Sequence, residues 1–313
     1  MRIIFMGTPD FAVKSLETLN INYNVVAVVT APDKKRGRGQ KVIPTPVKEF
    51  ATKTGLPVLQ PSNLKDPEFI EILKSYNPDL NVVVAFRMLP EAVFSLPTNG
   101  SINLHASLLP DYRGAAPINH AIINGEKQTG VTTFFLDKKI DTGRIIMQHN
   151  VNIYPNDTAG TLHDKLMVTG ASILSATVKE IEEGTAEAAP QIKKSDKSAP
   201  KIYKEDCEID WSKDGRVIHN FIRGLSPYPA AWTTFTKNGK PFTAKIFMGH
   251  FAKEDHDMIP GILKINENKL AIAVKRGWYE IQELQPQSKK RVTAEEFLRG
   301  LQKSDELKLK MLS

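Results

Sequence analysis

The chain has little cysteine and no long apolar run. Its single cysteine, Cys207, excludes an internal disulfide and suits a reducing compartment. The longest apolar runs, such as the stretch VVAVV, are too short to span a bilayer. The opening residues show no basic segment followed by an apolar one, so we expect no secretory signal peptide. These absences predict a soluble cytoplasmic protein with no membrane partner.

Several cofactor and nucleophile motifs are also missing. There is no GxxxxGK[ST] phosphate loop, and neither GTPDF nor RGRGQK has the glycines of a dinucleotide fingerprint, which counts against a nicotinamide oxidoreductase. The seven histidines show no metal-ligand spacing, and no Gly-x-Ser-x-Gly elbow is present. We therefore expect catalysis that uses no metal and no nucleotide cofactor.

Composition and charge indicate a globular protein with a basic second half. The 313 residues are 41% hydrophobic and 25% charged, which allows two folded domains. Residues 1–189 hold 19 Lys+Arg and 19 Asp+Glu, whereas residues 190–313 hold 23 and 16, so the net charge of +7 lies in the second part. A polyanionic partner such as nucleic acid and a merely basic soluble surface explain this charge equally well.

The first part of the chain alternates buried-strand and helix patterns, which predicts an α/β fold with a mainly parallel sheet. The expected strands are 2–7, 24–30, 79–86 and 100–106, followed by 129–136 and 143–153. The expected helices between them are 10–20, 46–54, 66–75 and 117–124, and one long helix covers 158–183. We therefore assign residues 1–189 to a first domain.

The second part has a different pattern. Residues 190–207 are polar, with lysines and prolines, and are expected to form a linker. From residue 208 to 313, one helix candidate at 213–223 precedes short alternating segments separated by turn signals. This pattern predicts a small all-β domain, closed as a barrel, with a helix at 293–301.

The stretch GSINLHASLLPDYRGAAPINHA, residues 100–121, places two polar side chains in an apolar strand. Alternate residues of a strand share a face, so Asn103 and His105 point to one side and Leu104 to the other. Ligands bind beyond the carboxyl ends of strands in open α/β sheets. A lone histidine here is more often a core residue bonded to the backbone, but the second polar group on its face favours a catalytic pair.

Three further segments are candidates for the site. The turn IDTGR offers Asp141 as a carboxylate partner for His105, although spacing alone does not bring the two together. The segment RGAAPI, residues 113–118, places small residues and a proline at a helix start, where backbone N–H groups can face a ligand. The basic segment PDKKRGRGQKVIPTP, residues 32–46, suits either a solvated loop or a loop that grips RNA or phosphate.

Taken together, NLHASLLPDYRGAAPI and the following GVTTFFLDKKIDTGRII resemble the folate-dependent formyltransferases. The likeness extends to MGTPDFAVKSLE, GRGQKVIPTPVKEFA, LPVLQP and EIDWSKDGRVIHNFIRGLSPYPAAW, and so covers nearly the whole chain. The combination of SLLP with RGAAPI is specific for formyl transfer. The basic first loop and the appended β-domain resemble the branch that acts on tRNA.

The resemblance implies an enzyme with a Rossmann-like first domain and an OB-like barrel that follows the tRNA. It matches Asn103, His105 and Asp141 to the catalytic residues, with Asn103 and an imidazolium of His105 as donors to the oxyanion. It matches these residues to the folate site: Phe86, Arg87, Met88, Ser107, Leu108, Leu109 and Pro110. The loop residues Arg36, Arg38 and Lys41 are matched to the tRNA acceptor end.

The implied reaction moves a formyl group from 10-formyltetrahydrofolate to the α-amino group of methionine-charged initiator tRNA, with no metal, and we expect a monomer. Two positions depart from the family pattern: Arg87 and Ala230 stand where glycine is usual. The nearest alternative is a folate-dependent formyltransferase or hydrolase that acts on a small nucleotide or sugar amine. A non-catalytic RNA-binding protein built on the same scaffold is a second alternative, which the presence of all three catalytic residues disfavours.

Overall fold

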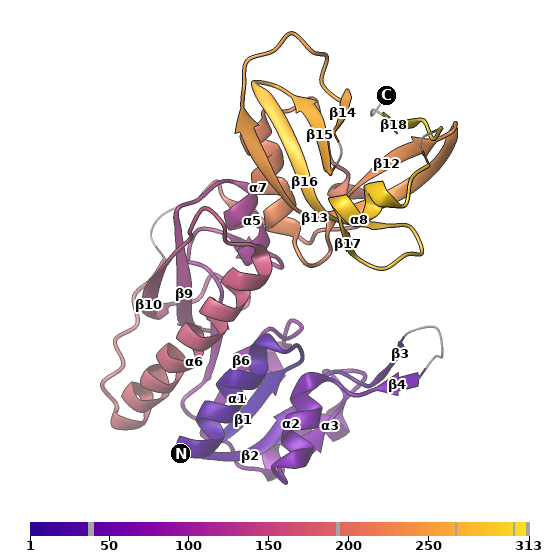
Figure 1. Ribbon diagram of the computed structural model, residues 1–313. Coiled ribbons are helices and arrows are strands. Elements are labelled where there is room, and N and C mark those ends of the chain that lie inside the picture. Colours follow the sequence, from indigo (N-terminus) through magenta and orange to yellow (C-terminus); the bar gives the residue numbers. More distant parts are fainter. Residues whose placement is uncertain (37–40, 192–194, 267, 303, 311–313) are drawn as a thin grey trace. The chain divides into compact units, whose positions relative to one another are not determined.

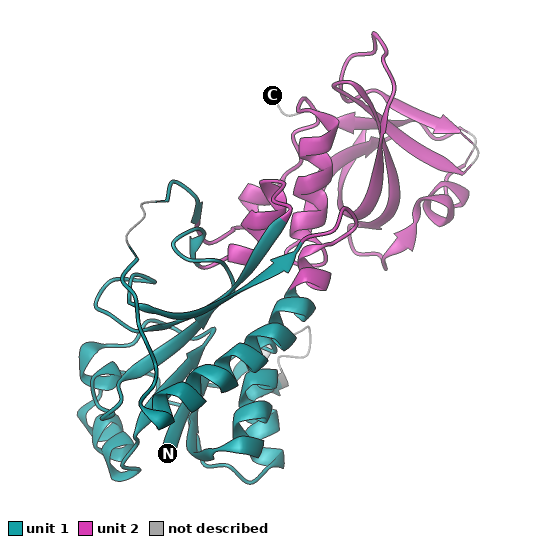
Figure 2. Ribbon diagram, turned by 90° about the vertical axis from the view of Figure 1, so that its left-hand side faces the viewer, with its two compact units in different colours: residues 1–114, 128–152, 163–198 teal, residues 115–127, 153–162, 199–313 magenta. Residues whose placement is uncertain are grey.

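The computed structural model describes residues 1–36, 41–191, 195–266, 268–302 and 304–310. It divides into two compact units, coloured separately in Figure 2. Unit 1 comprises residues 1–114, 128–152 and 163–198, and unit 2 comprises residues 115–127, 153–162 and 199–313. Within the described residues, no helix has the length and apolar character needed to cross a membrane.

Unit 1 is built on one sheet with the strand order β10-β9-β7-β6-β1-β2-β5. The strands β7, β6, β1, β2 and β5 are parallel neighbours, whereas β9 is antiparallel to both β7 and β10. Their bounds are β1 (Arg2–Gly7), β2 (Asn24–Val29), β5 (Val58–Leu59), β6 (Leu80–Val84), β7 (Ser101–His105), β9 (Gln128–Phe135) and β10 (Ile145–Asn152). The mainly parallel α/β sheet predicted from the alternating pattern is confirmed.

Helices cover both faces of this sheet, as Figure 1 shows for its first half. Phe69 and Leu73 pack with Ile4 and Met6 of β1 in one buried cluster. The helices are α1 (Phe11–Asn22), α2 (Pro46–Lys53), α3 (Pro67–Ser75), α4 (Glu91–Phe94) and the long α6 (Ala159–Glu183), which begins in unit 2 and continues in unit 1. Proline at the first turn of α2 and α3 and the side-chain caps of Thr45 and Asp66 explain where those two helices begin.

The basic segment 32–46, which suits a loop by sequence, contains a short antiparallel hairpin. It is formed by β3 (Lys34–Arg36) and β4 (Lys41–Ile43). The charged residues of β3 hide the strand character from a reading based on apolar alternation. Two further short strands, β8 (Arg113–Gly114) and β11 (Ser198–Ala199), pair with each other.

Unit 2 is an antiparallel sheet with the order β14-β15-β16-β13-β12-β18, and β17 pairs with β16. The end strands β14 and β18 come close to each other, so the sheet curls into a nearly closed barrel. Buried Trp211, Phe235 and Tyr279 contribute to its core. Its elements are α5 (Pro117–Ile123), a 3₁₀ turn (Glu205–Cys207), α7 (Gly215–Leu225), β12 (Ala231–Lys237), β13 (Lys240–Lys253), β14 (Leu263–Asn266), β15 (Lys269–Val274), β16 (Gly277–Pro286), β17 (Val292–Thr293), α8 (Ala294–Arg299) and β18 (Leu307–Lys310).

Candidate active site

Strand β7 directs its polar residues to one face of the sheet and its apolar residues to the other. Gly170 of α6 lies so close to Leu104 that a side chain at position 170 would clash with it, which shows that α6 covers the Leu104 face. Asn103 pairs with Val83, which belongs to the cluster around α3, and His105 pairs with Thr132 of β9. Asn103 and His105 therefore lie on the face opposite α6, as the alternation predicted.

The two polar side chains of β7 differ in how they are held. Asn103 is half-buried, and its amide has no hydrogen-bond partner among the described residues. His105 is only 6% exposed, and its Nε2 lies 2.9 Å from the carbonyl oxygen of Tyr112. Because a carbonyl only accepts, Nε2 carries the hydrogen, and a neutral His105 ring has its lone pair on Nδ1. Asn103 and Nδ1 of His105 thus remain available to a substrate.

The loop between β9 and β10 brings Asp141 next to His105. Its Oδ2 atom lies 3.9 Å from Nδ1 of His105 and accepts a hydrogen bond of 3.0 Å from the backbone N–H of Gly114. The turn is tight: Asp141 has a left-handed φ of 53°, and a Cβ atom at Gly143 would lie 1.7 Å from the carbonyl oxygen of Phe135. His105 and Asp141, 36 positions apart in the sequence, are therefore neighbours in this site.

The loop that follows β7 is anchored by side chains of β9 and β10. Thr132 donates a hydrogen bond of 2.6 Å to the carbonyl of Ser107 and accepts one of 3.1 Å from the N–H of Leu109. Gln148 donates to the carbonyl of Leu109 at 2.8 Å and to the Thr132 hydroxyl at 2.9 Å. The Leu109–Pro110 peptide is cis, and the buried Ser107 hydroxyl donates to the carbonyl of Asp111. Side chains of β9 and β10 thus fix the conformation of the SLLP loop, residues 107–110.

A second loop, with Phe86, Arg87 and Met88, follows the neighbouring parallel strand β6. Carboxyl ends of parallel neighbours lie at the same edge of a sheet, so this loop and the SLLP loop emerge together. Arg87 donates to the carbonyls of Pro61 and Ser62, and its guanidinium lies 5.6 Å from the centre of the Phe86 ring. Met88 is 73% exposed.

Arg87 does not strain this loop by replacing the usual glycine. The left-handed backbone of the segment is at Ala85, with a φ of 47°, whereas Arg87 does not have a positive φ. Arginine is therefore tolerated at position 87, and its side chain ties the loop to residues 61 and 62.

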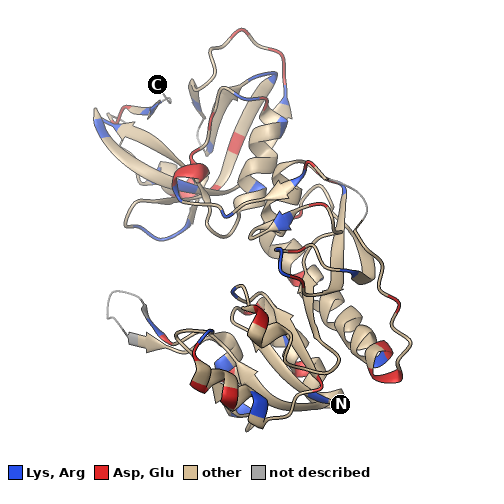
Figure 3. Ribbon diagram, turned by 180° about the vertical axis from the view of Figure 1, so that it is seen from behind, with Lys and Arg blue, Asp and Glu red and all other residues tan. Residues whose placement is uncertain are grey.

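The basic hairpin holds two of the three residues matched to the tRNA end. Arg36 and Lys41 occupy opposite positions in the pairing of β3 with β4, and Arg38 lies outside the described residues. Figure 3 shows the basic residues of β3 in blue beside the undescribed segment 37–40. The hairpin thus holds Arg36 and Lys41 at the base of its connection.

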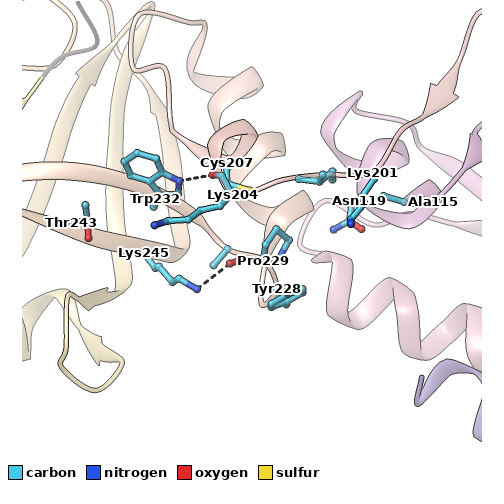
Figure 4. Close-up of a pocket in the computed structure, with 13 residues that line it drawn as sticks. Ala115, Asn119, Lys201, Lys204, Cys207, Tyr228, Pro229, Trp232, Thr243 and Lys245 are labelled. Carbon is cyan, nitrogen blue, oxygen red and sulfur yellow. Dashed lines mark hydrogen bonds between the residues drawn. The ribbon is translucent and has the colours of Figure 1, made fainter. Parts of the chain in front are cut away.

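Unit 2 contains a pocket of about 560 Å³. Lys201, Lys204 and Lys245 line it together with Tyr228 and Trp232 (Figure 4). None of the three lysines forms a salt bridge within the described residues, and Tyr228 is 81% exposed. The Trp232 indole donates to the carbonyl of Lys204 at 2.9 Å, and the Lys245 ammonium donates to the carbonyl of Pro229 at 3.1 Å. The pocket therefore combines positive charge with aromatic surface.

The only cysteine of the sequence, Cys207, lines the same pocket, but its surroundings make the thiol unreactive. Burial raises the pKa of the Cys207 thiol, and its Sγ donates to the carbonyl of Tyr203 at 3.1 Å. A protonated thiol is a poor nucleophile. Among the described residues, no group of three His, Cys, Asp or Glu side chains is placed to hold a metal ion.

Comparison with known proteins decides the family. The sequence model of the formyl transferase family matches residues 1–178, and that of the formyl transferase C-terminal domain matches residues 201–302. The chain belongs to the formyl transferase family. It is 50% identical over 311 residues to a methionyl-tRNA formyltransferase of Flavobacterium johnsoniae, covering 99% of each protein. It is 47% identical over 317 residues to a methionyl-tRNA formyltransferase of Bacteroides fragilis, covering 99% of this chain and 98% of the relative.

Solved formyl transferases share the fold. A sugar 3N-formyl transferase, solved in the presence of dTDP and 5-N-formyl-THF, aligns with a TM-score of 0.64 at 24% identity, covering 93% of this chain and 99% of the other. An N-formyltransferase from Helicobacter canadensis, in complex with folinic acid and dTDP-3-aminofucose, aligns with a TM-score of 0.64 at 23% identity, covering 89% and 97%. The fold of this chain is thus shared with both of these solved proteins.

Sequence reasoning missed Thr132 and Gln148. Thr132 belongs to a β-rich stretch, QTGVTTFF, in which a threonine is an ordinary strand residue. Gln148 is one polar residue among several in β10. Their role depends on how β9 and β10 pair next to the SLLP loop, and the spacing of residues in the sequence does not predict that pairing.

Proposed function

We propose that this protein transfers the formyl group of 10-formyltetrahydrofolate to the α-amino group of methionine-charged initiator tRNA, the reaction used in translation initiation. The observation that carries the proposal is the arrangement of Asn103, His105 and Asp141 at one site in a formyl transferase. The names of relatives that are half identical over the full length support the acceptor.

The chemistry requires donors for a developing oxyanion. The amine attacks the formyl carbonyl, the carbonyl oxygen gains negative charge, and the bond to N10 of the folate then breaks while the amine loses a proton and N10 gains one. A free α-amino group has a pKa of about 8, so a useful fraction is unprotonated near neutral pH. The unpartnered amide of Asn103 donates an N–H to the oxyanion.

His105 supplies the second donor. Since Nε2 already donates to the carbonyl of Tyr112, the nitrogen that faces the reacting atoms is Nδ1, and it donates when the ring is an imidazolium. Oδ2 of Asp141 lies 3.9 Å from this nitrogen, close enough for its negative charge to interact with an imidazolium. Asp141 also passes protons, through water, from the attacking amine to the leaving nitrogen.

The two loops at the carboxyl edge of the sheet form the folate site. Phe86, Arg87 and Met88 lie on one of them, and Ser107 to Pro110 lie on the other. The half-buried Phe86 and the exposed Met88 provide apolar surface for a flat ring system. Arg87 shapes its loop through Pro61 and Ser62. The fixed backbone of the SLLP loop provides the opposite wall.

The tRNA is held by basic residues of both parts of the chain. Arg36, Arg38 and Lys41 grip the acceptor end. The pocket of Lys201, Lys204 and Lys245 contacts backbone phosphates, and its exposed Tyr228 ring offers a stacking surface for a base. In functional terms, residues 1–189 carry the chemistry, residues 208–313 bind tRNA, and residues 190–207 connect the two and add Lys201 and Lys204 to the tRNA-binding pocket. The protein acts as a cytoplasmic monomer.

The test is formyl transfer from 10-formyltetrahydrofolate to methionine-charged initiator tRNA, methionine-charged elongator tRNA and free methionine. We expect formylation of the charged initiator and little of the other two. Transfer to a small amine, with none to charged tRNA, would refute the acceptor. A Lys204→Ala, Lys245→Ala double variant is expected to raise KM for tRNA and reduce its dependence on salt, with KM for the folate unchanged. Unchanged KM and salt dependence would exclude the pocket from tRNA binding.

A further inference from the structure

The turn that carries Asp141 is fixed by a residue distant in the sequence, Gln191. Its Nε2 donates to the backbone carbonyl of Asp141 at 3.0 Å and to that of Gly143 at 2.8 Å. Both carbonyls belong to the tight turn and have no partner in a regular ladder. One side-chain amide therefore spans the turn directly behind the Asp141 carboxylate.

The amide of Gln191 is itself held by Arg113. The Arg113 guanidinium donates to Oε1 of Gln191 from Nε, at 3.2 Å, and from Nη2. Because carbonyls only accept and a guanidinium only donates, the two ends of the amide have one consistent orientation. Arg113 precedes Gly114, whose N–H binds Oδ2 of Asp141. Two successive residues of the RGAAPI segment thus reach Asp141, one directly and one through Gln191.

The backbone next to Gln191 is also anchored to this turn. Ala189 and Ile145 exchange two backbone hydrogen bonds of 2.8 Å, and Arg144 donates to the carbonyl of Ala188. Residues 188–191 therefore run along the start of β10, within unit 1. This contact places the Gln191 side chain over the turn.

We propose that Gln191, oriented by Arg113, is a positioning residue that holds the Asp141 carboxylate at its working distance from His105. The proposal rests on the proposed function, which assigns a role to Asp141. Without Gln191, two carbonyls of the turn lose their donor, and the left-handed conformation of Asp141 loses the contacts that maintain it. A misplacement of about 1 Å in a catalytic group costs on the order of 10²-fold in rate.

The test compares Gln191→Leu and Gln191→Glu with the matched control Gln128→Leu, which changes an exposed glutamine of the same unit. Glutamate keeps the acceptor for Arg113 and loses both donated bonds, so this variant tests the hydrogen bonds from Gln191 to the turn by themselves. We expect kcat to fall by about 10–100-fold in both Gln191 variants, with KM for folate and tRNA within about 3-fold of wild type. The control is expected to behave as wild type.

A double-mutant cycle separates positioning from general destabilisation. In an Asp141→Asn background, Gln191→Leu should lower kcat by less than about 3-fold further, because the group that it positions is already lost. The same loss in both backgrounds, or an unchanged kcat in Gln191→Glu, would overturn the proposal.

A second readout does not depend on the acceptor. The amide hydrogen of Gly114, bonded to Asp141, is expected to exchange about 10-fold or more faster in Gln191→Glu, with the Tm nearly unchanged. If the wild type fails to formylate charged tRNA, the proposed function is wrong. The exchange rate at Gly114 still tests whether Gln191 holds the turn that carries Asp141. Unchanged exchange at Gly114 would show that Gln191 does not hold the carboxylate.

Discussion

Nδ1 of His105 lies 3.9 Å from Oδ2 of Asp141, beyond hydrogen-bond reach but close enough for their charges to interact. The backbone holds each group separately: the carbonyl of Tyr112 accepts from the ring, and the N–H of Gly114 donates to the carboxylate. His105 and Asp141 therefore lie close together without a direct hydrogen bond between them. Such spacing leaves Nδ1 free to point at a reacting carbonyl while the negative charge of Asp141 stays nearby.

Replacing Asn103 by alanine should lower kcat for formyl transfer by about 10²–10³-fold, the usual loss when one oxyanion donor is removed. The Tm should change little, because the amide has no partner among the described residues. Steady-state kinetics with charged initiator tRNA provides the measurement. Asn150→Ala, at an exposed asparagine of β10, is the matched control. Near-normal turnover in Asn103→Ala would exclude this residue from the chemistry.

Thr132→Val should loosen the SLLP loop and raise KM for the folate by about 10-fold, while KM for tRNA stays unchanged. The variant leaves the buried N–H of Leu109 and the carbonyl of Ser107 without their shared partner, at a cost of about 1–3 kcal/mol for each unsatisfied group. Thr133→Val is the control, because Thr133 is the next residue of β9 and the variant breaks a buried hydrogen bond of 2.7 Å to Thr177 of α6. If both variants raise KM for the folate equally, the loop anchor is not specific.

Ala230→Gly should stabilise the protein by about 0.5–1 kcal/mol. Ala230 has a left-handed φ of 73°. That conformation costs an alanine roughly 1–2 kcal/mol, which glycine would not lose. Glycine also has more conformational freedom in the unfolded chain, which lowers the gain in stability by about 0.4–1 kcal/mol. Urea unfolding provides the measurement. Ala231→Gly, at the first position of β12, should instead destabilise by about 0.5–1 kcal/mol. A loss of stability in Ala230→Gly would contradict the prediction.

His219 should make the stability of the barrel unit sensitive to acid. Burial, with a further contribution from Arg223, lowers the pKa of His219 below its usual value of 6.5. The unfolded chain therefore takes up the proton first. The contribution of the neutral His219 ring to the free energy of unfolding is fully present above about pH 6.5. It is lost as the pH falls from there toward the folded-state pKa of His219. Urea midpoints at pH 7.5, 6.5 and 5.5 should fall less in His219→Gln than in wild type, and exposed His149→Gln serves as control. Equal losses in wild type and His219→Gln would contradict this assignment.

The sequence predicts the part of the site that follows from strand periodicity. Alternation places Asn103 and His105 on one face, and the DTG turn offers Asp141. It does not predict the contacts that hold these groups. Gln191 follows a helix and belongs to a polar segment rich in lysine and proline, which has the composition of a linker. Its role arises only because residues 188–191 pair with the start of β10, a long-range contact with no sequence periodicity.

The resemblance and the structure also inform each other at the two unusual positions. At position 87 the backbone does not have a positive φ, so the family's glycine is dispensable and arginine gains two carbonyl partners. At position 230 the backbone is left-handed, so alanine is strained there. Two glycine replacements that look alike in sequence thus differ in physical consequence, because only one lies where the chain requires a positive φ.

The most direct test of the account is the single-turnover rate of formyl transfer to methionine-charged initiator tRNA in His105→Ala, Asp141→Asn and the double variant. If the two residues act as one unit, each single variant should lose at least about 10²-fold, and the double variant should be little slower than the slower single variant. Single variants with the wild-type rate, or losses that multiply in the double variant, would contradict the proposed catalytic pair.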